Sequence, residues 1–146
     1  IQLIAIPGAY TISWVSSKLG NIRTLMLLVA MWSVGCIVGY NLPVGGVNEF
    51  YGLAVIIGFI MGGIQSLSRS TYSKLMPATS DTASYFSFYD VTEKIATVIG
   101  MFGFGYITEL TGSQRNSVLA LMVFFVIGFF LLIYTDRIKS ESHATV

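Results

Sequence analysis

The chain has 146 residues, of which 54% are hydrophobic and 10% are charged, with a net charge of +1 and a mean hydropathy of +0.75. Because a soluble domain carries about 25% charged residues, this composition excludes an ordinary water-soluble globule and predicts a protein whose outer solvent is lipid. The near-neutral charge and the lack of a basic run in the sequence argue against nucleic acid as a partner. The single cysteine, Cys36, excludes an internal disulfide.

Five segments are apolar and long enough, or nearly so, to cross a bilayer as helices, since a span needs roughly 20 mainly apolar residues. They cover residues 1–17, 24–41, 50–74, 83–108 and 116–135. Turn-forming stretches separate them: SSKLGNIR, NLPVGGVN, MPATSDTA and LTGSQRNS. The apolar runs are unbroken, which favours helices over strands, and lipid would leave an open sheet edge unpaired. The predicted fold class is therefore an all-α membrane protein with five transmembrane helices in one domain, residues 1–146.

The basic residues predict an orientation. Positive charge accumulates in short cytoplasmic loops of membrane proteins. One side of the predicted bundle receives only Arg115, and the other receives six basic residues: Lys18, Arg23, Arg69, Lys74, Arg137 and Lys139. We therefore expect an integral multi-pass protein with a cytoplasmic C-terminus. The chain opens at Ile1 in the middle of an apolar segment, so we also expect it to be a fragment of a longer protein.

Three charged residues of the fourth segment are not explained by loop solvation. Asp90, Glu93 and Lys94 share one face of a helix and lie near the cytoplasmic edge of the hydrocarbon. Arg69, near the end of the third segment, lies at a similar depth, and consecutive antiparallel helices are expected to pack side by side. One interpretation is an ion-pair cluster at a cytoplasmic gate. The other is that a carboxylate binds a proton or a substrate cation, because two close carboxylates disfavour joint ionisation.

Other polar and aromatic residues are candidates for a solute pathway. Gln65 shares a face with Arg69, and Thr97 lies one turn beyond Glu93. Tyr10 and Trp14, one turn apart, could line the same pathway or be ordinary core or interface aromatics.

Small residues predict close helix contacts in the membrane, because glycine lets two backbones approach. The expected packing positions are Gly35, Gly39, Gly58, Gly62, Gly100 and Gly103.

The sequence contains no catalytic signature. HExxH, P-loop and GxSxG motifs are absent, and the only histidine, His143, lies in a polar tail. We therefore expect no enzymatic activity, no metal site and no cofactor.

Taken as a whole, the chain resembles the C-terminal half of a major facilitator superfamily transporter. The turn SSKLGNIRTLML is similar to a glycine-plus-basic cytoplasmic turn of that superfamily. The strings GGIQSLSRSTYSKLMP, FSFYDVTEKIATVIG and ITELTGSQRNSVLALMVFFVIGFFLL resemble the vacuole effluxer family, whose fungal members export amino acids from the vacuole and which has many bacterial relatives. This resemblance implies the last five helices of a twelve-helix transporter, with the N-terminal half of the same protein as the missing partner.

The sequence thus predicts a fragment of a secondary active transporter, located in a bacterial inner membrane. It would contribute one wall of the substrate pathway and the cytoplasmic gate, for amino acids or another small solute, with protons as a candidate coupling ion. An alternative is a membrane structural or interaction subunit without transport activity, and a channel is a third class.

Overall fold

The computed structural model describes residues 2–43 and 45–144, and the side chains within these ranges up to residue 138. Every regular element in these ranges is an α-helix. The helices are α1 (Gln2–Leu19), α2 (Asn21–Asn41), α3 (Val47–Leu75), α4 (Thr82–Thr111) and α5 (Gln114–Ala144).

Local chemistry sets several helix ends. Gly20 separates α1 from α2 with a φ of 89°, a conformation that L side chains rarely adopt. Asp81 caps α4, because its carboxylate accepts a hydrogen bond from the Ser84 amide at 3.3 Å. At the other end of α4, Gly112 adopts the left-handed conformation and its amide donates to the Thr108 carbonyl at 2.9 Å.

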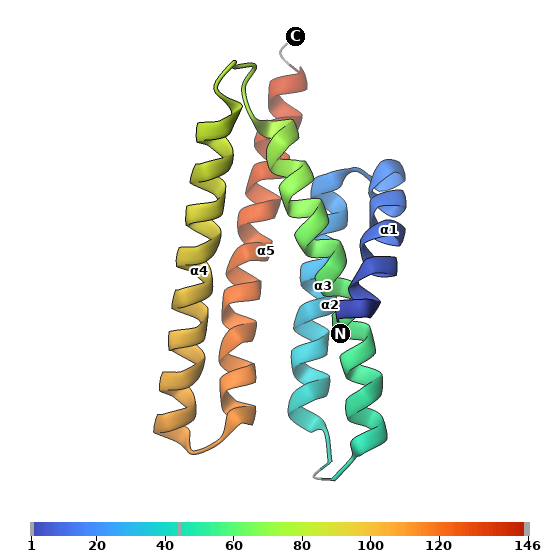
Figure 1. Ribbon diagram of the computed structural model, residues 1–146, viewed down its shortest axis with the longest axis vertical. Helices are drawn as coiled ribbons and strands as arrows, with labels where there is room; N and C mark the ends of the chain where they lie inside the picture. The colour runs from blue at the N-terminus through green and yellow to red at the C-terminus, as the bar shows by residue number, and fades with distance from the viewer. Residues whose placement is uncertain (1, 44, 145–146) are drawn as a thin grey trace.

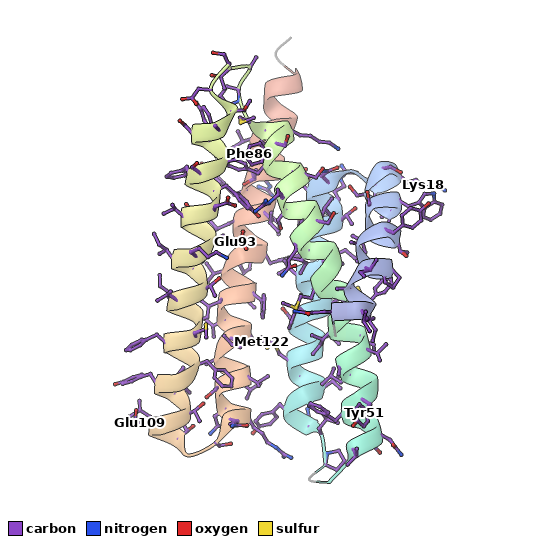
Figure 2. The ribbon with its side chains drawn as sticks, in the orientation of Figure 1. Lys18, Tyr51, Phe86, Glu93, Glu109 and Met122 are labelled. Carbon is purple, nitrogen blue, oxygen red and sulfur yellow. The ribbon has the colours of Figure 1, made fainter. Side chains whose placement is uncertain are left out.

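The helices run up and down, and the turns alternate between two ends of the molecule (Figure 1). The α1–α2 turn, the α3–α4 turn and the C-terminal end of α5 lie at one end, and the α2–α3 and α4–α5 turns lie at the other. Figure 2 shows Lys18 and Phe86 toward the first end and Tyr51 and Glu109 at the second. The basic turns predicted to be cytoplasmic therefore share one end of the bundle.

The five helices do not all pack on one another. α1 packs on α3 and α2, α2 packs on α3 and α5, and α4 packs on α5. The buried cluster comprises Ile12, Leu25, Leu28, Ile60 and Leu67, so it lies among α1, α2 and α3. Trp32 of α2 stacks on Phe125 of α5 with ring centroids 5.3 Å apart.

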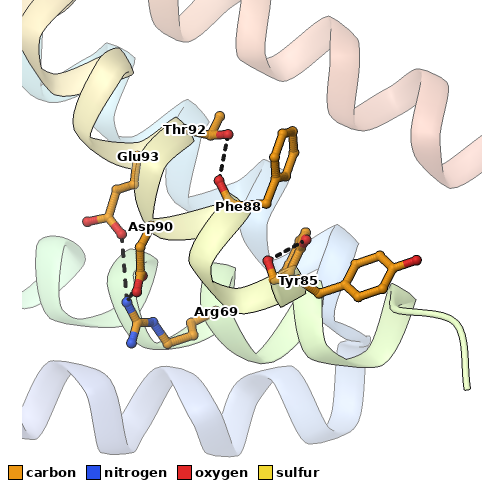
Figure 3. A network of polar contacts seen from close by, with 7 residues as sticks. Arg69, Tyr85, Phe88, Asp90, Thr92 and Glu93 are labelled. Carbon is orange, nitrogen blue, oxygen red and sulfur yellow. Dashed lines mark hydrogen bonds and ion pairs between the residues drawn. The ribbon is translucent and has the colours of Figure 1, made fainter. Parts of the chain in front are cut away.

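The expectation that the third and fourth helices pack side by side is wrong. Over their full described lengths, α3 and α4 have no close backbone contact, and α5 is the helix against which α4 packs. Among the described residues, long side chains of α3 reach across to α4 near the turn between the two helices (Figure 3). Adjacency in sequence predicted the turn correctly, but a six-residue connection from Met76 to Asp81 leaves the two helix axes free to diverge.

Within the described residues, three helices are long and apolar enough to cross a membrane: α2, α3 and the Gln114–Ile138 part of α5. The all-helical prediction is confirmed for the described residues, and membrane-spanning capacity is supported for these three. α1 has 18 residues, and α4 carries Asp90, Glu93 and Lys94 in its first half. Five complete spans stay a prediction.

Candidate functional site

An ion pair joins α3 to α4 at the end that carries the basic turns. Arg69 Nη2 lies 2.6 Å from Asp90 Oδ1 and 3.9 Å from Glu93 Oε2 (Figure 3). The carboxylates are three residues apart on α4, so one guanidinium reaches both. The three side chains are about half exposed, at 56% for Arg69, 52% for Asp90 and 44% for Glu93. The structure therefore brings three of the four predicted cluster residues together at an accessible position.

Lys94, the fourth predicted cluster residue, makes no ion pair with any carboxylate in the described part of the chain. Arg69 is thus the one described cation within 4.0 Å of Asp90 or Glu93. One positive group facing two carboxylates leaves the cluster with an excess negative charge when all three are ionised.

An aromatic contact lies beside the ion pair. The Tyr72 hydroxyl donates to the backbone carbonyl of Tyr85 at 2.9 Å. The Tyr72 ring lies 5.0 Å from the Tyr89 ring and 6.1 Å from the Phe86 ring. The Arg69 guanidinium lies 5.6 Å from the centre of Tyr89. Sequence reasoning assigned no role to Tyr72, although its spacing of three residues from Arg69 places both on one face of α3.

The two polar pathway candidates flank this site. Gln65 is exposed on α3, one turn before Arg69, and Thr97 is exposed on α4, one turn beyond Glu93. The Thr97 hydroxyl donates to the Glu93 carbonyl at 2.8 Å, the common backbone contact of threonine in a helix.

The two aromatic pathway candidates lie elsewhere. Tyr10 and Trp14 are 82% and 58% exposed on α1, which packs on α2 and α3 and has no close backbone contact with α4. Lys18 Nζ lies 4.0 Å from the centre of the Trp14 ring. An exposed tryptophan with a lysine over its face is typical of a membrane–water interface. The structure does not bring these two aromatics to the Arg69 cluster.

The glycines differ widely in what they contact. A Cβ on Gly62 would overlap the backbone of Ala5, and a Cβ on Gly8 would overlap the backbone of Phe59, so α1 and α3 touch at glycine. Gly63 faces Ile12 in the same interface. Gly8 was missed in the sequence because a lone glycine next to a proline in a short helix carries no repeat signal.

The remaining predicted packing glycines make looser contacts. A Cβ would lie 3.9 Å from Ile57 at Gly35, 3.5 Å from Leu53 at Gly39 and 3.9 Å from Phe124 at Gly103. Gly58 is buried in α3, and Gly100 faces open space within the described residues.

A second polar cluster, which sequence reasoning did not identify, joins the α1–α2 turn to α3. Asn21 Oδ1 accepts from the Ser16 hydroxyl at 2.9 Å and from Lys74 Nζ at 3.0 Å. Asn21 Nδ2 lies 3.5 Å from the Ser70 hydroxyl. One amide side chain therefore connects α1, α2 and α3 at the basic end of the bundle.

A large groove between α2 and α3 does not coincide with the charged cluster. It has a volume of about 830 Å³ and is lined mainly by apolar side chains such as Met31, Leu53 and Ile56. Such a lining offers few groups to recognise a polar solute. Among the described residues, no group of three or more His, Cys, Asp or Glu side chains could hold a metal ion.

Comparisons of the sequence with known proteins agree on one family. The sequence model described as "Vacuole effluxer Atg22 like" matches residues 1–145. An uncharacterized MFS-type transporter, YxiO of Bacillus subtilis, is 27% identical over 93% of this chain and 31% of its own length. Autophagy-related protein 22 of Yarrowia lipolytica is 33% identical over 87% of this chain and 22% of its own length.

A third relative, autophagy-related protein 22 of Cryptococcus neoformans, is 31% identical over 87% of this chain and 26% of its own length. The chain thus spans less than a third of these curated relatives. No solved structure matches it.

Proposed function

Because this chain belongs to the vacuole effluxer Atg22-like family, a family of transporters, we propose that it forms one wall of a solute pathway whose cytoplasmic side is closed by Arg69, Asp90 and Glu93. The missing partner is an N-terminal half of the same protein, and the two halves rock against each other to expose the solute alternately. Amino acids are the first solutes to test.

The observation that carries this proposal is the nature of the α3–α4 contact. The two helices are joined by the Arg69–Asp90 ion pair without close backbone packing. Such a contact can open by rotation of side chains, with little repacking of the buried cluster on α1, α2 and α3. Charged residues at this depth face a bundle interior or a water-filled cavity rather than lipid.

The same proposal includes five spans with the basic turns in the cytoplasm. Outward-facing residues of α4 support its placement in lipid, since Phe88, Ile95 and Phe102 are 69%, 56% and 74% exposed. Cysteines introduced in the full-length protein at Asn48 and Gln114 should react only with an impermeant reagent added outside, and one at Lys74 only from the cytosol. Cytosolic labelling at position 114 would contradict the five-span arrangement.

Transport by the full-length protein in liposomes tests the gate. We expect saturable counterflow with one or more members of a panel of labelled amino acids. Arg69→Gln and Asp90→Asn should each lower the initial rate about fivefold, which corresponds to about 1 kcal/mol, the upper end for a half-exposed ion pair. The double neutral variant should recover much of the lost rate, because it restores the wild-type net charge of the three side chains, one negative charge when all are ionised.

Lys94→Gln is the matched control, since it removes a charge from the same turn of α4 without removing a described ion pair. Equal losses in the Arg69 and Lys94 variants would contradict a specific gate. Transport at ion-channel rates, or no transport of any panel member with an intact fold, would favour the channel or the structural subunit.

A carboxylate that binds the coupling proton would give a different set of transport results from that of a gate. If Asp90 or Glu93 carries the coupling proton, its amide variant should abolish uptake driven by a pH gradient and leave counterflow intact. Changing Arg69 as well would not rescue that variant, so the two roles are distinguishable.

A further inference from the structure

We propose that Tyr72 is a positioning residue of this gate: it sets the separation and register of α3 and α4, so that Arg69 reaches Asp90 and Glu93. The inference rests on the proposed gate and assigns a role to a residue beside the ion pair. Tyr72 contributes both a hydrogen bond and an aromatic surface to α4.

Over their described lengths α3 and α4 do not pack backbone against backbone, so close packing does not set their spacing. Where helices pack closely, interlocking side chains fix their spacing. Here the spacing depends on side chains that reach across, and the Met76–Asp81 turn does not hold the axes parallel. A spacer is here a side chain that holds two helices at a fixed separation. Arginine alone is a poor spacer, because its long stem adopts many rotamers.

Tyr72 has the properties of a spacer. Its ring is rigid, with two rotatable bonds, and it lies against Phe86 and Tyr89, which are three residues apart on one face of α4. Sliding along α4 by one turn would remove these ring contacts. The hydroxyl fixes the same register through the Tyr85 carbonyl.

The side-chain contacts between α3 and α4 follow one another along the helices, starting from the turn that joins them. Tyr72 bonds Tyr85 nearest the turn, its ring then meets Tyr89, and Arg69 lies over Tyr89 before it reaches Asp90. Tyr89 therefore touches both the spacer and the cation. A shift of Tyr72 along α4 would move the ion pair with it.

The test is a distance measurement in the full-length protein, with spin labels on Ser73→Cys and Ser87→Cys in a Cys36→Ser background. Both serines are exposed, one on α3 and one on α4. Tyr72→Phe keeps the ring and removes only the hydroxyl, so the fold should survive. We expect it to raise the population of separated α3–α4 distances about threefold to tenfold, the effect of losing one hydrogen bond.

Tyr85→Phe is the matched control, because the Tyr85 backbone carbonyl accepts the bond and its own hydroxyl plays no part in it. The Tyr85 variant should leave the distances unchanged. Tyr72→Leu, which also removes the ring, should separate the helices further than Tyr72→Phe does.

Combining the Tyr72 and Arg69 variants distinguishes a positioning role of Tyr72 from simple packing. If Tyr72 positions the ion pair, Arg69→Gln should change the distances less in the Tyr72→Phe protein than in the wild type. Fully additive effects, or a Tyr72→Phe distribution identical to that of the wild type, would overturn the proposal.

This measurement needs no solute, so the two proposals can fail separately. If Tyr72→Phe leaves the α3–α4 distances unchanged while Arg69→Gln slows counterflow, the gate is retained and the positioning role of Tyr72 is rejected. Changed distances without any change in counterflow would retain the spacer and reject the gate.

Discussion

The two sides of α3 are built differently. Toward α1, glycines bring backbone against backbone, with Gly62 on Ala5 and Gly8 on Phe59. Toward α4, there is no close backbone contact among the described residues, and half-exposed polar and aromatic side chains bridge the space. The first contact cannot open without losing packing along a helix, whereas the second can open by breaking a few side-chain contacts.

This difference follows from the forces available in lipid. Between membrane helices, association depends on van der Waals packing and hydrogen bonds, because burial from lipid gives little hydrophobic gain. Close packing at glycine therefore makes a durable joint. An ion pair shared by three half-exposed groups is weak and is screened by salt. α3 thus has one closely packed interface and one that is bridged by exposed side chains.

The largest expected effect comes from filling the glycine contact. Gly62→Ala would place a Cβ 2.7 Å from the Ala5 Cα, closer than real Cβ contacts. We expect a loss of about 1–3 kcal/mol of unfolding free energy, the usual cost of overpacking. Thermal unfolding of the full-length protein in detergent measures it.

Gly100→Ala is the control for helix propensity, since a Cβ there meets nothing within 4 Å in the described structure. Its effect should stay within about 1 kcal/mol and be neutral or stabilising. Equal destabilisation by the two alanines would show that backbone contact does not distinguish the α1 side of α3.

A smaller loss is expected where α4 is held by its other neighbour. Ser117 of α5 is fully buried and its hydroxyl lies 2.6 Å from that of Thr108. The Thr108 hydroxyl also donates to the Phe104 carbonyl, so it accepts from Ser117. Ser117→Ala should cost about 0.6 kcal/mol, the mean for hydrogen bonds between membrane helices.

The double variant Ser117→Ala with Thr108→Val tests the pairing. If the bond joins α4 to α5, the combined loss should be smaller than the sum of the two single losses. Additive losses would mean that the two hydroxyls stabilise the helices independently of each other.

The sequence predicted where the helices lie along the chain better than it predicted which helices pack together. Apolar run length and turn residues predicted all five helices, because both signals are local. The α3–α4 packing prediction was wrong, because chain adjacency does not determine which helix fills the space beside another. Charge at equal depth identified Arg69, Asp90 and Glu93 as residues that meet, although their role as a gate stays a prediction.

Other parts of the site required the folded structure. Tyr72 acts on a backbone carbonyl, and Asn21 joins three helices through one amide, so neither has a distinctive partner in the sequence. Gly8 contacts a helix about fifty residues away along the chain. Such contacts depend on how helices cross, which composition and spacing do not encode.

The smallest effect on stability is expected from the ion pair itself. Arg69→Gln should lower the unfolding free energy by less than about 1 kcal/mol, because Arg69 and Asp90 are each more than half exposed and such pairs are weak. The difference between wild type and variant should shrink further in about 1 M salt, where charges are screened within about 3 Å. Thermal unfolding at low and high salt measures both effects, with Lys94→Gln as the control for the removed charge. A salt-independent loss as large as that of Gly62→Ala would make the α3–α4 contact a structural joint like the α1–α3 contact. A small, salt-sensitive loss, together with slowed counterflow, would support α3 as a helix fixed on one side and reversibly held on the other.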